Sequence, residues 1–213
     1  MSAVEDVLDT AAARAWIDRF AAAFADSRER LNDLDRQSGD GDFGSNLESA
    51  MERVAQGLAD APPETPGAVL GVVATAFMHT GGTSGPLFGM WFTQLSRAAG
   101  AEAGIGLASL AAGALAGLAG IQRLGGAQPG DKTMVDALAP AAGALSTAAE
   151  SGATLADGLA QAAAAARAGA DATAPMLARR GRASYVGEAA RGVADPGALT
   201  VALLFESALG DGG

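Results

Sequence analysis

Apolar residues recur at helical spacing along most of the chain. Near the N-terminus Trp16, Phe20 and Phe24 recur every fourth residue with Ile17 beside them, whereas the charged side chains of this segment lie mostly elsewhere around the helix. This pattern predicts a first helix over residues 5–34. The same reasoning predicts seven further helices, at residues 46–59, 67–80, 86–95, 101–124, 131–149, 155–172 and 198–209.

Helix starts and interruptions are marked by proline. Asp195 precedes Pro196, which predicts an N-cap followed by the first helical residue, and Ser84 is a plausible cap just before Pro86. Pro140 falls inside the sixth predicted helix and is expected to kink or break it.

Short links join the predicted helices, which favours antiparallel neighbours. The expected fold is therefore all-α, an eight-helix antiparallel up-and-down bundle or barrel that forms a single domain over residues 1–213. Alternate loops of such a fold meet at one end. The loops after the first, third, fifth and seventh helices should cluster there, and these are the loops richest in glycine, hydroxyl and charged residues.

Composition agrees with a helical protein and excludes several classes of site. Apolar residues make up 49% of the 213, whereas aromatic residues are only 5%, and alanine is abundant. The net charge of −10 argues against a nucleic-acid partner. Because the chain has no cysteine and one histidine, His79, neither a disulfide framework nor the usual zinc site can form. His79 is expected to be a partly buried capping or packing residue rather than a catalytic one.

One stretch raises the question of a membrane. Residues 104–121 carry no charge and reach the lower length limit for a spanning helix. They lack a flanking Trp or Tyr belt, so a buried helix of a soluble protein is favoured over a membrane span. The first residues include Glu5, Asp6 and Asp9 and show no basic segment of a secretory signal. We therefore expect a cytoplasmic protein.

Three aspartates, Asp35, Asp40 and Asp42, lie close together in a glycine-rich segment after the first predicted helix. Their charges repel unless a cation joins them, and carboxylate oxygens without sulfur or imidazole favour Mg²⁺. The alternative is an ordinary turn, because Asp and Gly are common turn residues and Asp is a good N-cap. The spacing does not fit an EF-hand, since Gly44 and Ser45 occupy positions that need other residues.

The other clustered loops supply groups that bind phosphate. Thr83 and Ser84 lie in a glycine-rich turn, and Lys132 and Arg182 follow in later loops. Together with Mg²⁺, these groups are the ones needed to bind a polyphosphate and to stabilise the charge that develops during phosphoryl transfer. The basic residues have simpler interpretations. Lys132 could be a surface residue at a helix start, and the arginines at 179, 180 and 182 could form a solvated basic loop.

The motifs together resemble one family. These are Gly39-Asp-Gly-Asp-Phe-Gly44, Gly81-Gly-Thr-Ser-Gly-Pro-Leu-Phe-Gly89, Gly130-Asp-Lys-Thr-Met134, Gly181-Arg-Ala-Ser-Tyr185 and Asp195-Pro-Gly197. In this order they resemble the nucleotide-binding L subunit (DhaL) of dihydroxyacetone kinases. The resemblance implies an eight-helix antiparallel barrel that binds a nucleotide, ADP or ATP, and two Mg²⁺ ions at one end.

The resemblance also implies residue roles. Asp35, Asp40 and Asp42 match the Mg²⁺ ligands, and together with Arg182 they are the expected catalytic groups. The residues expected to contact the nucleotide are Phe43, Gly44, Ser45, Asn46, Thr83, Ser84, Gly125, Met134, Arg182, Asp195, Pro196 and Gly197. Met134 suits the apolar wall beside a base. Phe43 departs from the family, which usually has histidine there, so a side-chain hydrogen bond to phosphate is lost.

The implied activity is a Mg²⁺-dependent phosphoryl transfer to dihydroxyacetone or a related keto-sugar. The resemblance implies that a partner K subunit holds the sugar, and that a phosphohistidine protein of the phosphotransferase system recharges ADP in some systems. A homodimer or hetero-oligomer is expected, with no nucleic acid and no membrane as partner. The alternative, motivated by Phe43, is a nucleotide-binding regulatory or interaction protein without catalysis.

Overall fold

The structure, a computed structural model, describes residues 6–210. Eight long helices dominate this part of the chain. They are α1 (Thr10–Ser38), α2 (Phe43–Asp60), α3 (Pro66–Met78), α4 (Ser84–Ala99), α5 (Leu107–Gly125), α6 (Val135–Glu150), α7 (Leu155–Ala172) and α9 (Pro196–Glu206). The predicted all-α architecture of eight long helices is confirmed. Four short elements were not predicted, namely β1 (Leu8–Asp9), β2 (Gly104–Ile105), α8 (Ala183–Val186) and the 3-10 helix η1 (Gly187–Ala190).

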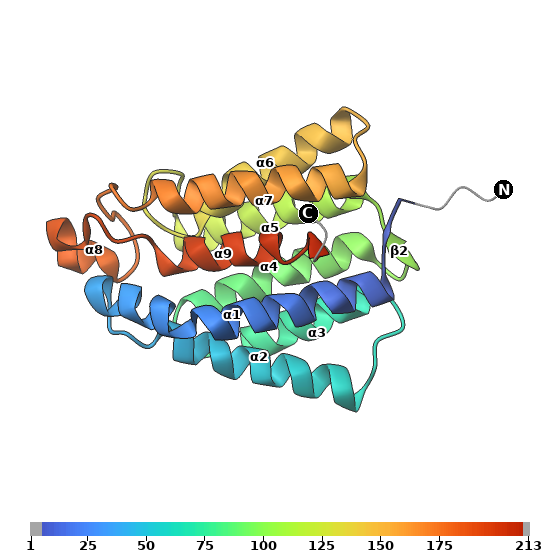
Figure 1. Ribbon diagram of the computed structural model, residues 1–213, viewed down its shortest axis with the longest axis horizontal. Helices are drawn as coiled ribbons and strands as arrows, with labels where there is room; N and C mark the ends of the chain where they lie inside the picture. The colour runs from blue at the N-terminus through green and yellow to red at the C-terminus, as the bar shows by residue number, and fades with distance from the viewer. Residues whose placement is uncertain (1–5, 211–213) are drawn as a thin grey trace.

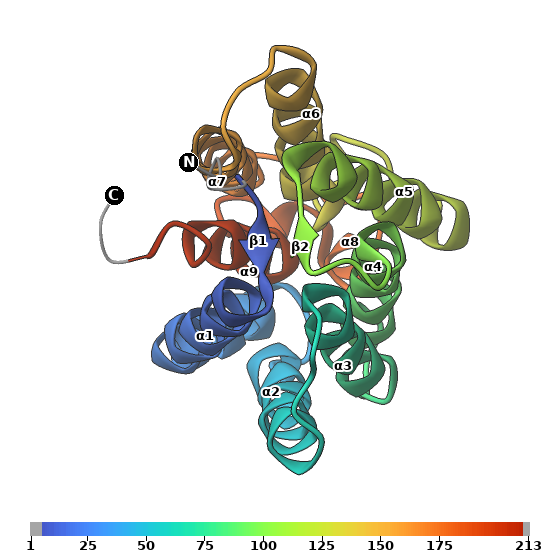
Figure 2. The ribbon, with the colours of Figure 1, turned by 90° about the vertical axis from the view of Figure 1, so that its right-hand side faces the viewer.

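The long helices form a ring in which each packs beside its neighbour in the chain (Figure 1). Figure 2 looks along the ring from one end and shows α9 between α7 and α1, where it closes the barrel. Aromatic side chains fill part of the interior, with the ring of Trp91 5.2 Å from Phe92 and 5.8 Å from Phe205. The indole nitrogens are satisfied as well, because Trp16 donates to the carbonyl of Leu204 at 2.7 Å.

The two strands lie at the end of the barrel away from α8 (Figure 1). Leu8 pairs with Ile105 and Asp9 with Gly104 in an antiparallel pair. Asp9 also caps α1 by accepting from the amide of Ala12 at 2.7 Å. The first helix therefore begins at Thr10, and position 5, its predicted start, lies outside the described residues. The fifth helix likewise begins six residues later than predicted, because residues 104–105 form β2.

Several helix ends differ from the predictions. Helix α1 continues to Ser38 and stops at Gly39, so Asp35 lies within the helix and not in a loop. Helix α6 starts at Val135, since residues 131–134 form a turn before it. The N-cap of α4 is Thr83, one residue before the predicted Ser84. Pro140 does not break α6, because α6 is one helix through that position, and the alternative of a kink stays a prediction.

Helix α5 is the one helix among the described residues whose length and composition would let it cross a membrane. In the structure it packs between α4 and α6, and glycines on its surface allow close contact. A side chain at Gly117, for example, would collide with Trp91 of α4. The helix is thus part of the barrel wall, with 44% of its most apolar stretch buried.

Candidate functional site

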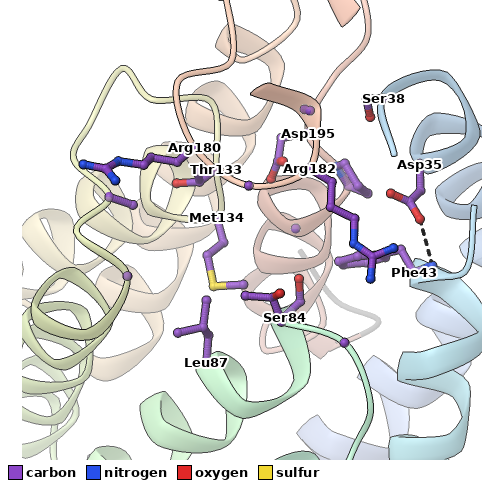
Figure 3. Close-up of a pocket in the computed structure, with 18 of the residues that line it drawn as sticks. Asp35, Ser38, Phe43, Ser84, Leu87, Thr133, Met134, Arg180, Arg182 and Asp195 are labelled. Atoms are coloured by element: carbon purple, nitrogen blue, oxygen red, sulfur yellow. Dashed lines mark hydrogen bonds between the residues drawn. The ribbon is translucent and has the colours of Figure 1, made fainter. Parts of the chain in front are cut away.

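A pocket of about 190 Å³ opens at the end of the barrel where α8 lies. Its walls come from the four connections that follow α1, α3, α5 and α7, together with the helix ends beside them (Figure 3). The prediction that these loops meet is confirmed. We call the longest of them, residues 173–195 between α7 and α9, the arginine loop, because it carries four arginines.

The three predicted aspartates converge at this pocket. Asp35, Asp40 and Asp42 each present a carboxylate oxygen within 4.8 Å of the others. Asp35 is buried in the last turn of α1, while Asp40 and Asp42 are exposed on the segment that leads to α2. Three hard oxygen donors on one side of the pocket fit Mg²⁺, which binds through one or two carboxylates and keeps positions for water and phosphate.

The chain around Asp35 fixes the orientation of its carboxylate. Oδ2 accepts hydrogen bonds from the amides of Gly41 at 2.9 Å and Phe43 at 3.0 Å, the latter drawn in Figure 3. The second oxygen, Oδ1, is left for a cation. Gly39 packs directly against Oδ1, where a β-carbon would collide with it, and Gly41 has φ +82°. Both glycines are therefore required for this turn.

Arginines from the arginine loop reach both sides of the pocket (Figure 3). Arg182 forms an ion pair with Asp40 and so lies beside the three carboxylates. Arg180 lies across the pocket, next to Gly126 at the end of α5. Sequence reasoning assigned a site role to Arg182 alone, and the lining position of Arg180 was missed. Both could hold phosphate oxygens, which guanidinium groups bind in a bidentate manner.

The residues after the aspartates play unequal parts. Phe43 and Asn46 line the pocket, but Gly44 and Ser45 do not. The amide of Gly44 already donates to Oδ1 of Asn32 at 2.8 Å, and Asn32 donates weakly to Oγ of Ser45 at 3.4 Å. Gly44 and Ser45 therefore connect α2 to α1 in this structure. No sequence motif pointed to Asn32, because its partner lies twelve residues away.

The α3–α4 turn forms the opposite wall. Thr83 and Ser84 line the pocket at the start of α4, with Gly81 and Gly82 before them. The side chain of Thr83 makes no capping bond, so the first amides of α4 have no side-chain partner. Amides at a helix start attract anions, which suits a phosphate.

The inner part of the pocket is apolar. Met134 is 4% exposed and lies with Leu87 and Ile121 in the wall (Figure 3). The predicted contacts Gly125, Pro196 and Gly197 line the same region. A β-carbon added at Gly197 would lie 3.4 Å from Cβ of Met134, so glycine there lets α9 approach the methionine closely. Such a wall fits the flat apolar face of a base.

Asp195 links the pocket to α9. Its carboxylate accepts from the amide of Ala198 at 2.7 Å, which confirms the predicted N-cap, with Pro196 as the first helical residue. Loss of solvent raises the pKa of Asp195 to about 7 despite this bond, and the charges of Asp136 and Asp35 act in the same direction. Its charge therefore changes near neutral pH.

Two further buried residues organise the turn before α6. Asp136 accepts from the amides of Gly130 at 2.5 Å and Thr133 at 2.8 Å, which shapes residues 130–134 around Met134. Lys132 is 1% exposed, and Nζ donates to backbone carbonyls of the arginine loop. The surface alternative for Lys132 is thus wrong; the residue does line the pocket, but its ammonium donates to these carbonyls. The direction of the side chain follows from a positive φ of 61°, which the sequence did not signal.

His79 lies outside this pocket. It is exposed at the end of α3, where Nδ1 lies 2.8 Å from the carbonyl of Thr75. Its capping position agrees with the expectation, but its partial burial was wrong. The only histidine of the chain therefore does not line the pocket.

Comparison with known proteins agrees with this geometry. Residues 37–210 match the family model described as "DAK2 domain". The chain is 34% identical over 192 residues to the ADP-binding subunit DhaL of the PEP-dependent dihydroxyacetone kinase of Escherichia coli K12, covering 90% of this chain and 91% of that one. It is 39% identical over 200 residues to L-erythrulose 1-kinase of Mycolicibacterium smegmatis, covering 92% of this chain and 34% of that one.

Similar solved structures include the dihydroxyacetone kinase of C. freundii. The native form gives a TM-score of 0.69 at 28% identity and covers 98% of this chain and 36% of that one. The form in complex with AMP-PNP and Mg²⁺ gives a TM-score of 0.66 at 28% identity and covers 91% of this chain and 32% of that one. The chain thus spans nearly all of the bacterial DhaL subunit but about a third of the larger kinases.

Proposed function

The chain belongs to the DAK2 domain family of DhaL-type dihydroxyacetone kinase subunits, and from this premise we propose that it is a nucleotide-binding phosphoryl-transfer subunit. We further propose that the chain is a single domain, described over residues 6–210, that passes phosphate through Mg-ADP or Mg-ATP to a small keto-sugar. The observation that carries this proposal is the convergence of Asp35, Asp40 and Asp42 at a pocket that also holds Arg182 and the start of α4.

We assign different roles to the residues along the pocket. The three carboxylates would hold two Mg²⁺ ions, which supply positive charge that neutralises the phosphate oxygens. The first amides of α4 and the hydroxyls of Thr83 and Ser84 orient the phosphates. Met134 packs against the base and keeps water from that end of the pocket. Arg182 stabilises charge on the phosphoryl group as it moves.

The acceptor sugar belongs on another chain. A covalent carbonyl-binding histidine is absent from the pocket, because the single histidine lies outside it. We therefore assign the sugar to a K-type partner subunit that docks at the open end, within a homodimer or hetero-oligomer in the cytoplasm. The E. coli relative is named as an ADP-binding subunit of a PEP-dependent kinase, which favours a phosphohistidine protein as the source of phosphate.

Metal binding provides the direct test. We expect the double substitution Asp40→Ala and Asp42→Ala to abolish binding of ADP in the presence of Mg²⁺, measured by isothermal titration calorimetry. Asp26→Ala, which removes an exposed carboxylate from the same region of the chain, is the matched control and should bind like the unmodified protein. Equal affinity for the double variant and the control would refute the proposal.

Phe43 motivates a second candidate, a nucleotide-binding regulator without catalysis. Its ring is 8% exposed and cannot donate to phosphate, although its amide still bonds to Asp35. Reconstitution with a K subunit separates the two functions. Formation of dihydroxyacetone phosphate above background excludes the regulator, whereas nucleotide binding without transfer supports it. Native mass measurement then identifies the donor type, because bound ADP indicates recharging in place.

A further inference from the structure

Lys132 is the only lysine in the chain, whose other thirteen basic side chains are all arginines. It is also a rare case of a fully buried cation, with 1% of the residue exposed. The positive φ of 61° is unusual for a residue with a long side chain. None of the roles assigned to the pocket explains these three properties.

The ammonium group of Lys132 joins the two ends of the arginine loop. Nζ donates to the carbonyls of Ala174 at 3.3 Å and Met176 at 3.1 Å, where the loop begins. It also donates to Ala190 at 2.7 Å, where the loop returns. The amide of Gly192 donates to the carbonyl of Ala174 at 2.8 Å and joins the same two ends. We call this junction of residues 174–176 with residues 190–192 the neck of the loop. All three donors of the ammonium are therefore used by one loop.

This arrangement requires lysine. A compact ammonium offers three donors around one atom, whereas the donors of arginine lie in a plane that fits carboxylates and phosphates. Burial lowers the pKa of Lys132, opposed by the charge of Asp195. Because a buried charge is costly unless it is hydrogen bonded, the three carbonyls are needed to keep the ammonium in place.

The two pocket arginines belong to the loop that this neck closes. Arg180 and Arg182 lie between its two ends, and the ion pair of Arg182 with Asp40 is about half exposed. An exposed pair of this kind contributes little by itself and cannot hold a loop of this length. We infer that Lys132 is a positioning residue, which anchors the arginine loop so that Arg180 and Arg182 face the nucleotide phosphates. The statement that Arg180 and Arg182 face nucleotide phosphates rests on the proposed function, but the anchoring of the loop by Lys132 does not.

Limited proteolysis tests the anchoring without any nucleotide. Trypsin cuts after arginine, and the loop offers Arg179, Arg180 and Arg182 as sites. We expect Lys132→Met to be cut in the loop several-fold faster than the unmodified protein. Arg167→Met is the matched control, because it removes a half-buried cation that joins α7 to Glu206 of α9. Equal cleavage of the two variants would overturn the inference.

Nucleotide affinity tests the positioning. We expect Lys132→Met to weaken binding of Mg-ADP roughly tenfold and to have almost no effect when Arg180 and Arg182 are already alanine. Loss of affinity that is equally large in both backgrounds would show a general structural defect and contradict the inference. If the unmodified protein itself does not bind Mg-ADP, the proposed function fails, and the proteolysis result still decides the anchoring.

Chemical rescue provides a readout specific to the ammonium. Because the chain has no cysteine, Lys132→Cys creates a single thiol. This thiol can be alkylated with 2-bromoethylamine in the unfolded protein, and the protein is then refolded. Aminoethylation should restore protection from trypsin, and alkylation with iodoacetamide should not.

A measurement on the unmodified protein tests the inference even if the variants do not fold. Its single ¹⁵N-labelled lysine ammonium should give one slowly exchanging NMR signal, and rapid exchange would overturn the inference.

Discussion

At the scale of single residues, the site depends on carboxylates placed in different environments. Asp35 is buried and held by two amides, Asp40 pairs with an arginine, and Asp195 lies in the pocket wall as a helix cap. Loss of solvent raises the pKa of Asp195 to about 7, and the like charges of Asp136 and Asp35 act in the same direction.

This environment predicts how stability changes with pH. The pKa of Asp195 rises from an ordinary 3.8 to about 7 in the folded protein, so the folded state holds more protons between these values. Stability should therefore fall as pH rises through this window and level off above 7. We expect Asp195→Asn, which keeps an oxygen for the amide of Ala198, to lack this loss and to be more stable at pH 8 by roughly 1 to 3 kcal/mol.

Thermal unfolding from pH 5 to pH 8 in EDTA checks the prediction. The chelator is needed because a metal ion near Asp35 would change the charge that Asp195 experiences. The melting temperatures of the two proteins should already differ at pH 5, and the difference should grow up to about pH 7 and then level off. Parallel curves would show that Asp195 stays ionised throughout.

The residues that could be predicted from the sequence are those whose chemistry is local. The cap at Asp195 and the cluster of Asp40 and Asp42 depend on neighbours within a few positions. Lys132 could not be assigned, because its carbonyl partners lie 42, 44 and 58 residues away. Asn32 was missed for the same reason. A short sequence motif contains no information about such partners.

At the scale of the elements, helix existence was predictable and helix ends were not. The recurrence of apolar residues marked all eight long helices, because each buries one face against its neighbours. The end of α1 was placed four residues early, since Asp35 and Ser38 are polar yet lie on its buried face. Strands of two residues, such as β1 and β2, give no periodic pattern.

Close packing of α6 and α7 gives a prediction at this scale. Gly169 of α7 faces the α6 backbone, and an added β-carbon would lie 3.0 Å from Cα of Ala137 and collide with the carbonyl of Asp136. We expect Gly169→Ala to destabilise the protein by about 1 to 3 kcal/mol, because backbone atoms cannot move aside cheaply. The change should also weaken nucleotide binding, since Asp136 shapes the turn at Met134.

Gly143 supplies the matched control. It is an exposed glycine inside α6 with nothing within 4 Å of an added β-carbon. Gly143→Ala should therefore stabilise the protein by about 0.5 to 1 kcal/mol through its better helix propensity. Urea denaturation of both variants measures the two effects. Stabilisation by Gly169→Ala would show that the contact between the helices is looser than the structure indicates.

At the scale of the whole molecule, the up-and-down ring accounts for the position of the site. Because consecutive helices alternate in direction, the four connections that carry the charged and glycine-rich residues all reach one end (Figure 1). This could be predicted from the order of the loops alone. The orientation of the arginine loop could not, because it depends on the neck at Lys132.

The same end of the molecule also presents most of the large exposed apolar side chains. Among residues 6–210, five of seven such side chains belong to segments that meet there, namely Met78, Leu124, Leu177, Tyr185 and Val186. Tyr185 is 90% exposed, so in the isolated chain its ring buries almost no apolar surface. Exposed apolar groups around a pocket are typical of an interface, so we expect a sugar-bearing partner to cover them.

Substitution of Tyr185 tests this expectation. Tyr185→Ser should leave Mg-ADP affinity unchanged, because Tyr185 does not line the pocket, and should raise the KM for the K partner about tenfold, the usual size for loss of a central aromatic contact. Leu209→Ser removes an exposed apolar side chain just after α9, outside the four pocket connections, and should change neither quantity. Steady-state transfer assays at varied partner concentration distinguish the two. If both variants transfer phosphate like the unmodified protein, the partner binds elsewhere, and the apolar groups around the pocket are not its docking surface.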